Sequence, residues 1–193
     1  MKSFASYPVF NHPALILAVM GVVSGILGTY VDGPVYGDPP HPGVYMVLTG
    51  AWFGLVVGFG VWRWGNRTGI AAATAFVATW VGWQAAVNVA LQFEEPWLSA
   101  AISDALRMYI SGAVAGAVGA FVTWFGAALF TARLRHSMVA VGMLAIGGLF
   151  GLLLPLTSHY DNPAVLLVPW QAAVAATLGL GLGLGLAPER AHA

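Results

Sequence analysis

The sequence contains no cysteine, and its single lysine is Lys2. The absence of cysteine excludes disulfides, thiolate metal sites and c-type haem attachment. The position of Lys2, before the first apolar segment, leaves no lysine for a retinal Schiff base within the membrane. All five histidines also lie outside the long apolar segments. This excludes a haem held by two histidines in the middle of a membrane.

Charged residues are scarce. They make up 7% of the 193 residues, whereas soluble domains contain about 25%. Hydrophobic residues make up 59%, and the mean hydropathy is +0.81. This composition predicts an all-α, polytopic membrane protein.

Spanning the hydrocarbon of a bilayer takes about 20 apolar residues, and the chain offers six such segments. They lie near 14–31, 44–62, 69–92, 105–131, 138–157 and 164–186. The first is long for a signal sequence and no small-x-small cleavage site follows it, so we expect a transmembrane helix there. The connections are short, and we therefore expect residues 1–193 to form a single transmembrane domain.

The loops on the two sides of this arrangement differ in charge. One side receives both termini and the cations Lys2, Arg63, Arg67, Arg133, Arg135 and Arg190. The positive-inside rule predicts that this side, with both termini, is cytoplasmic. We expect an integral protein of a prokaryotic plasma (inner) membrane, with the lipid bilayer as its partner and no nucleic acid bound.

Three amides recur at helical spacing in the third segment, where Gln84, Asn88 and Gln92 share one face. Amides are costly against lipid, so this face is expected to bond neighbouring helices or to line a polar path. The residues proposed to line such a path are Gln84, Asn88, Gln92, Arg107, Ser111 and Gln171. We expect Arg107 to pair with an acid of the 93–104 loop, although snorkelling to the interface is an alternative.

The loops on the non-cytoplasmic side are acidic and could form an outer mouth for this path. Its proposed residues are Asp32, Asp38, His41, Glu94, Glu95, Asp104, His159 and Asp161. No cofactor is predicted; a divalent metal ion is the alternative, with His41, His159 and Asp161 as candidate ligands. Turn formation and solvation explain these residues equally well.

Glycines recur at GxxxG spacing in several segments, for example at Gly50, Gly54 and Gly58. This spacing lets helix backbones approach closely and predicts a homo-oligomer or hetero-oligomer formed through these faces. Together with the Pro and His loops on one side and Gln171 in the last helix, the glycine-rich helices distantly resemble small polytopic proteins proposed as cobalt transporters. The spacing differs, so no residue role is carried over.

Two functions follow as hypotheses. The first is a small transporter or channel-like protein that moves a cation, such as a metal ion, or a small polar solute from an acidic outer mouth. The second is a non-catalytic membrane subunit or assembly factor. The motifs HExxH, GxSxG, GxGxxG and the P-loop are all absent, so enzyme activity is less expected. A membrane enzyme using the Asp and His residues of the mouth is the third possibility.

Overall fold

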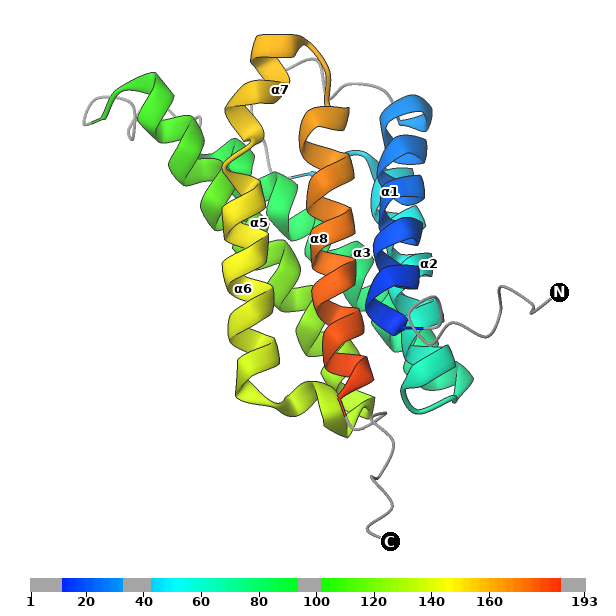
Figure 1. The fold of residues 1–193 in the computed structure, drawn as a ribbon. Helices are drawn as coiled ribbons and strands as arrows, with labels where there is room; N and C mark the ends of the chain where they lie inside the picture. The colour runs from blue at the N-terminus through cyan, green and yellow to red at the C-terminus, as the bar shows by residue number, and fades with distance from the viewer. Residues whose placement is uncertain (1–11, 33–42, 94–101, 185–193) are drawn as a thin grey trace, which may run out of the picture.

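The structure is a computed structural model that describes residues 12–32, 43–93 and 102–184 (Figure 1). Its elements are α1 (Pro13–Val31), α2 (Val47–Trp64), α3 (Gly69–Gln92), α5 (Asp104–Phe130), the 3₁₀ helix η3 (Ala132–Arg135), α6 (Ser137–Gly151), α7 (Leu154–Tyr160) and α8 (Ala164–Gly183). The described residues contain helices and no strand, which confirms the all-α class. Six helical spans, with α6 and α7 counted as one, are long and apolar enough to cross a membrane.

The predicted segments correspond to the observed helices, with one difference. The segment expected at 138–157 is divided into α6 and α7 by a break after Gly151. Pro155 lies in the first turn of α7. Because proline has no N–H and its ring conflicts with the carbonyl four residues earlier, a continuous helix through this position is unfavourable.

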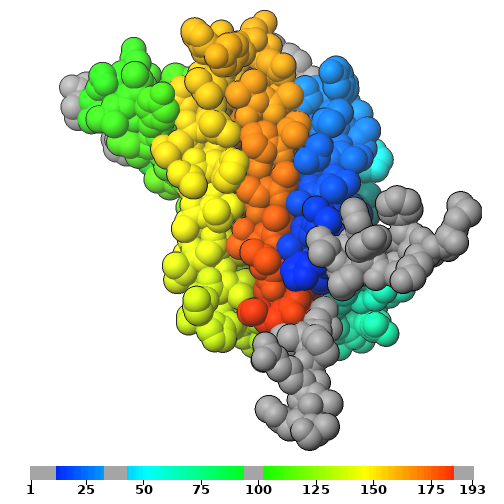
Figure 2. All heavy atoms as spheres, viewed as in Figure 1, coloured from blue at the N-terminus to red at the C-terminus, as the bar shows by residue number. Residues whose placement is uncertain are grey.

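The six spans form a closed ring. Going round it, α1 contacts α2, α2 contacts α3, α3 contacts α5, α5 contacts α6, α6 contacts α8, and α8 returns to α1. Figure 2 shows α6, α8 and α1 packed side by side on one face. Large apolar side chains such as Val19, Leu55, Val81 and Phe125 are exposed on the outside of the ring, where a membrane protein contacts lipid.

Glycines bring the helix backbones of the ring together. A methyl group added to Gly21 would lie 2.7 Å from the Gln171 carbonyl oxygen of α8. On α5, one added to Gly112 would meet the backbone of Gly151 in α6. The glycines at 50, 54 and 58 in α2 likewise face α3. These faces are covered by helices of the same chain, so a partner protein would need a different surface.

Apart from Arg107, which pairs with Asp104, the described acidic and basic side chains lie at opposite ends of the ring. We call the end where α1, α3 and α7 finish the acidic end, and it carries Asp32, Asp104 and Asp161 (the upper end in Figure 1). The opposite, basic end carries Arg63, Arg67, Arg133 and Arg135. Arg135 donates to the carbonyl oxygens of Ala128 and Leu129, the first at 3.0 Å. Cations placed there satisfy carbonyls that the end of α5 leaves without helical partners.

Candidate ligand cavity at the acidic end

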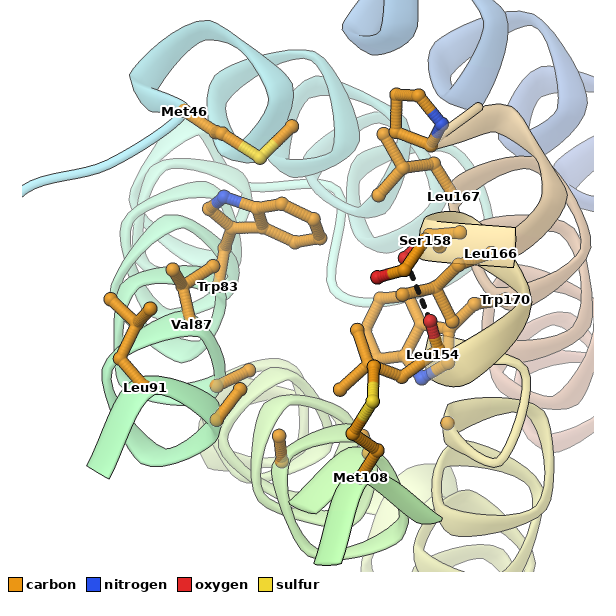
Figure 3. Close-up of a pocket in the computed structure, with 18 of the residues that line it drawn as sticks. Met46, Trp83, Val87, Leu91, Met108, Leu154, Ser158, Leu166, Leu167 and Trp170 are labelled. Atoms are coloured by element: carbon orange, nitrogen blue, oxygen red, sulfur yellow. Dashed lines mark hydrogen bonds between the residues drawn. The ribbon is translucent and has the colours of Figure 1, made fainter. Parts of the chain in front are cut away.

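A cavity of about 480 Å³ lies inside the ring near its acidic end (Figure 3). It is enclosed by the second half of α3, the first halves of α5 and α8, the end of α6, and α7. Its lining residues are Met46, Trp83, Ala86, Val87, Ala90, Leu91, Met108, Gly112, Ala115, Gly116, Gly151, Leu154, Thr157, Ser158, Asp161, Asn162, Pro163, Leu166, Leu167 and Trp170. This volume is within the range of small-molecule sites.

Small residues form part of the cavity wall. Helix α3 contributes Ala86 and Ala90 and α5 contributes Ala115, whereas Gly112 and Gly116 of α5 pack against the backbone of α6. Side chains of this size cannot fill the space between helices that are held apart by larger neighbours. The remaining walls are formed mainly by indole, thioether and branched hydrocarbon groups.

The cavity ends within the ring and does not cross it. Its deepest aromatic residues, Trp83 and Trp170, contact each other with ring centroids 6.3 Å apart. Phe53 closes the cluster from α2, 5.6 Å from Trp170. From Trp83 to Leu91 the wall of α3 extends for about 12 Å, given the helical rise per residue. In this conformation the space is therefore a closed-bottomed pocket.

Apart from the indole N–H groups of Trp83 and Trp170, the polar side chains of the lining lie at the mouth of the cavity, at Thr157, Ser158, Asp161 and Asn162. Asn162 accepts a hydrogen bond from Ala164 N at 2.9 Å and so supports the start of α8. Asp161 follows the last residue of α7 and adopts a left-handed backbone conformation with φ 48°. Among the described lining residues it is the one that carries a charge.

The amide face of α3 lies outside the cavity and binds backbone. The side chain of Gln84 accepts from Tyr45 N at 2.9 Å and donates to Tyr45 O at 2.8 Å. Asn88 does the same to Gly43, at 2.6 and 2.7 Å. Alternate residues of an extended chain present their N–H and C=O groups to one side about 6.7 Å apart, close to the rise of about 6 Å over one i, i+4 step. Two amides at this spacing therefore act like the edge of a neighbouring strand.

We call residues 43–46 the strap. The amide contacts hold it against α3, and its last residue, Met46, turns with φ 46° to start α2. The side chain of Met46 then lines the cavity above Trp83 (Figure 3). The polar face of α3 thus shapes one wall of the cavity indirectly. Gln92, the third residue of that face, is half-buried in the last turn of α3.

Releasing the strap should be measurable. Asn88→Leu removes two hydrogen bonds to Gly43 and leaves its N–H and C=O without those partners, so the strap should open more often. We expect amide hydrogen exchange of residues 43–46 to accelerate at least about tenfold, the factor that corresponds to roughly 1.4 kcal/mol. Gln92→Leu, on the same helix, is the control and should leave this exchange unchanged. Equal exchange in wild type and Asn88→Leu would contradict the role of the amides.

Two of the predicted mouth acids support the fold. Asp32 accepts from Leu48 N at 3.2 Å and from Thr49 N, so α1 supplies the cap that Met46 cannot provide for α2. Arg107 forms an ion pair with Asp104 at 3.0 Å, one of the acids expected for it. Neither acid lines the cavity. Asp38, His41, Glu94 and Glu95 lie outside the described residues.

The other predicted path residues are buried against helices. Ser111 donates to Ala90 O at 3.1 Å and fastens α5 to α3. Gln171 is fully buried, and its amide nitrogen and oxygen have no hydrogen-bond partner among the described residues. Ser24 of α1 is 3% exposed, and its hydroxyl is likewise unpaired within the described part of the chain.

Of the candidate metal ligands, His159 is exposed, with its ring 4.8 Å from that of Tyr160, and Asp161 lies at the mouth of the cavity. Within residues 12–32, 43–93 and 102–184, no three His, Asp or Glu side chains gather as a metal site would require. The sequence reasoning did not identify Trp83, Trp170, Met46 or Met108 as site residues. A signal was present in the alanines at 86, 90 and 115, whose short side chains leave space between α3 and α5.

Comparisons with protein-family models, with curated proteins and with solved structures give no match to this chain.

Proposed function

We propose that this chain is a small membrane transporter that admits a cation or a small solute from the acidic end of the ring. One observation supports the proposal above all others: a cavity of small-molecule size lies inside a ring of six apolar spans, and four of these spans line it. In alternating access, a transporter switches between two states, each open to one side of the membrane. A pocket that is open at the acidic end and closed within the ring has the form of one such state.

The positive-inside rule places the basic end, with Arg63, Arg67, Arg133 and Arg135, in the cytoplasm. The cavity would then face the outside of a prokaryotic plasma membrane. The expected path along Gln84 and Asn88 shifts in this proposal, because both amides are engaged by the strap. The solute would instead enter on the adjacent face of α3, beside Val87 and Leu91.

The alternative function, a non-catalytic subunit or assembly factor, rested on glycine ridges and aromatic faces that would pack against partner proteins. The glycine ridges of α1, α2, α5 and α6 pack against helices of the same chain. The cavity has no evident purpose in a purely structural subunit, since internal space costs packing energy. This favours the transporter.

The test uses single cysteines in the naturally cysteine-free chain. Ala90→Cys lines the cavity, whereas Thr123→Cys and Val174→Cys lie deeper in the ring, where the native residues are 1% exposed. In intact cells an impermeant thiol reagent should label Ala90→Cys from outside. In inverted vesicles it should label the two deeper positions slowly, because alternating access exposes them in turn to the cytoplasm.

The chain contains no cysteine, so the wild-type protein has no thiol to label and serves as the blank. If the thiol reagent labels Ala90→Cys but neither deeper position from either side, the cavity binds a ligand without transporting it, and the transporter proposal fails. Labelling of Ala90→Cys only from the cytoplasmic side would overturn the orientation.

A further inference from the structure

The lining of the cavity restricts what can occupy it. Apart from the four residues of its mouth, the side chains that face it are hydrocarbon, indole or thioether groups, or glycine. An inorganic cation would have to give up its water there without receiving oxygen ligands in exchange, which is strongly unfavourable. An occupant that reaches Trp83 and Trp170 must therefore be largely apolar.

The charge at the mouth restricts the occupant further. Asp161 is the charged residue among the described lining residues, and it follows the carboxyl end of α7. The described residues of the acidic end include three acids, Asp32, Asp104 and Asp161, against the cation Arg107. The nearby cation Arg107 is paired with Asp104. The potential at the mouth is thus negative, which attracts cations and repels anions.

Taken together, these two features define an amphipathic cation. We propose that the cavity binds a small organic cation, such as an aryl or alkyl ammonium compound, with its charged group at the mouth beside Asp161. Its apolar body lies against Trp83 and Trp170, where indole rings supply a large contact area. This assignment rests on the proposed function, because it takes the same cavity as the place where solute is admitted.

The size of the cavity fits this class. A volume of about 480 Å³ accommodates one aromatic ring with a quaternary ammonium group and leaves space for a larger substituent. Neutral amphiphiles would contact the apolar walls equally well, but the charge of Asp161 would not increase their affinity. The contribution of Asp161 to binding is therefore the quantity that separates the two classes.

The experiment combines a charge change in the protein with one in the probe. Benzyltrimethylammonium and neopentylbenzene have the same shape, and only the first is charged. Asp161→Asn removes the carboxylate charge and keeps a residue that tolerates the left-handed conformation at position 161. Affinity is read as protection of Ala90→Cys from a maleimide in purified protein, with and without Asp161→Asn.

We expect benzyltrimethylammonium to protect Ala90→Cys, and Asp161→Asn to weaken this protection about tenfold at low salt. Protection by neopentylbenzene should change less than twofold between the two proteins. Because each probe is compared between proteins in the same detergent, its partition into micelles cancels. Benzenesulfonate, an anion of similar size, should protect poorly and improve with Asp161→Asn.

The outcomes separate this inference from the proposed function. An equal effect of Asp161→Asn on the charged and uncharged probes, or no protection by any of them, would overturn the organic-cation assignment while leaving a reactive and open cavity. If Ala90→Cys does not react at all in a folded protein, the cavity is closed to solvent and the proposed function itself fails.

Discussion

Gly112→Ala is expected to destabilise the ring by about 2–3 kcal/mol, the upper part of the range for overpacked cores. The added methyl group would meet the backbone carbonyl of Gly151 and lie 2.8 Å from Cβ of Leu154. A backbone carbonyl cannot rotate away as a side chain can, so α5 and α6 would have to separate. The midpoint of thermal unfolding in detergent should fall by several degrees.

Gly142→Ala is the matched control on α6. There the methyl group would meet only Cγ2 of Thr177, at an ordinary distance of 3.4 Å. Since alanine favours helix by up to about 1 kcal/mol over glycine, this change should be neutral or stabilising. Equal effects of the two substitutions would mean that α5 and α6 do not touch through Gly112 and Gly151.

The second prediction compares the same change, glutamine to methionine, at two positions. We expect it to stabilise the protein at one position and to destabilise it at the other. Gln171→Met removes a fully buried amide whose two polar atoms have no partner among the described residues, so we expect stabilisation of about 1–3 kcal/mol. Gln84→Met removes an amide that makes two hydrogen bonds to Tyr45. The N–H and C=O of Tyr45 lose these partners on α3, so we expect a loss of about 2 kcal/mol.

Both variants are measured by thermal or denaturant unfolding of the same preparation, and methionine conserves approximate volume in each. A loss of stability in Gln171→Met would show that its amide has partners, such as ordered water, that matter to the fold. If Gln171 also serves the solute path, the variant should be more stable and yet less active, as occurs where a functional group is kept at the expense of stability.

The spans were predictable because they follow from local properties of the chain. Length and hydropathy set the positions of α1, α2, α3, α5 and α8, since each must bury or expose an apolar surface over a membrane's thickness. The pairing of Arg107 with Asp104 was also accessible, because an i, i+3 contact on one helix is encoded within four residues.

The site was less predictable because its contacts join distant parts of the chain. The polarity of Gln84 and Asn88 was evident, but their partners, the backbone groups of Gly43 and Tyr45, have no side-chain signature. Asp32 was expected at the mouth, whereas it caps α2, which its position before a long loop does not reveal. The cavity depends on which faces of α3, α5 and α8 meet. That pairing is set by the packing of the whole ring, and no local sequence pattern reveals it.

The contact between α1 and α8 has a consequence for biogenesis. The glycine face of α1 at Gly21 and Gly25 finds its partner backbone at Gln171 and Val168, almost 150 residues later in synthesis. During translation, α1 must wait in the bilayer or be held by other factors until α8 has emerged from the ribosome. Contacts of such sequence separation are slow to form because the intervening chain must first be ordered. Formation of the α1–α8 contact, which closes the ring, is therefore the step before which the chain is exposed to misassembly or proteolysis.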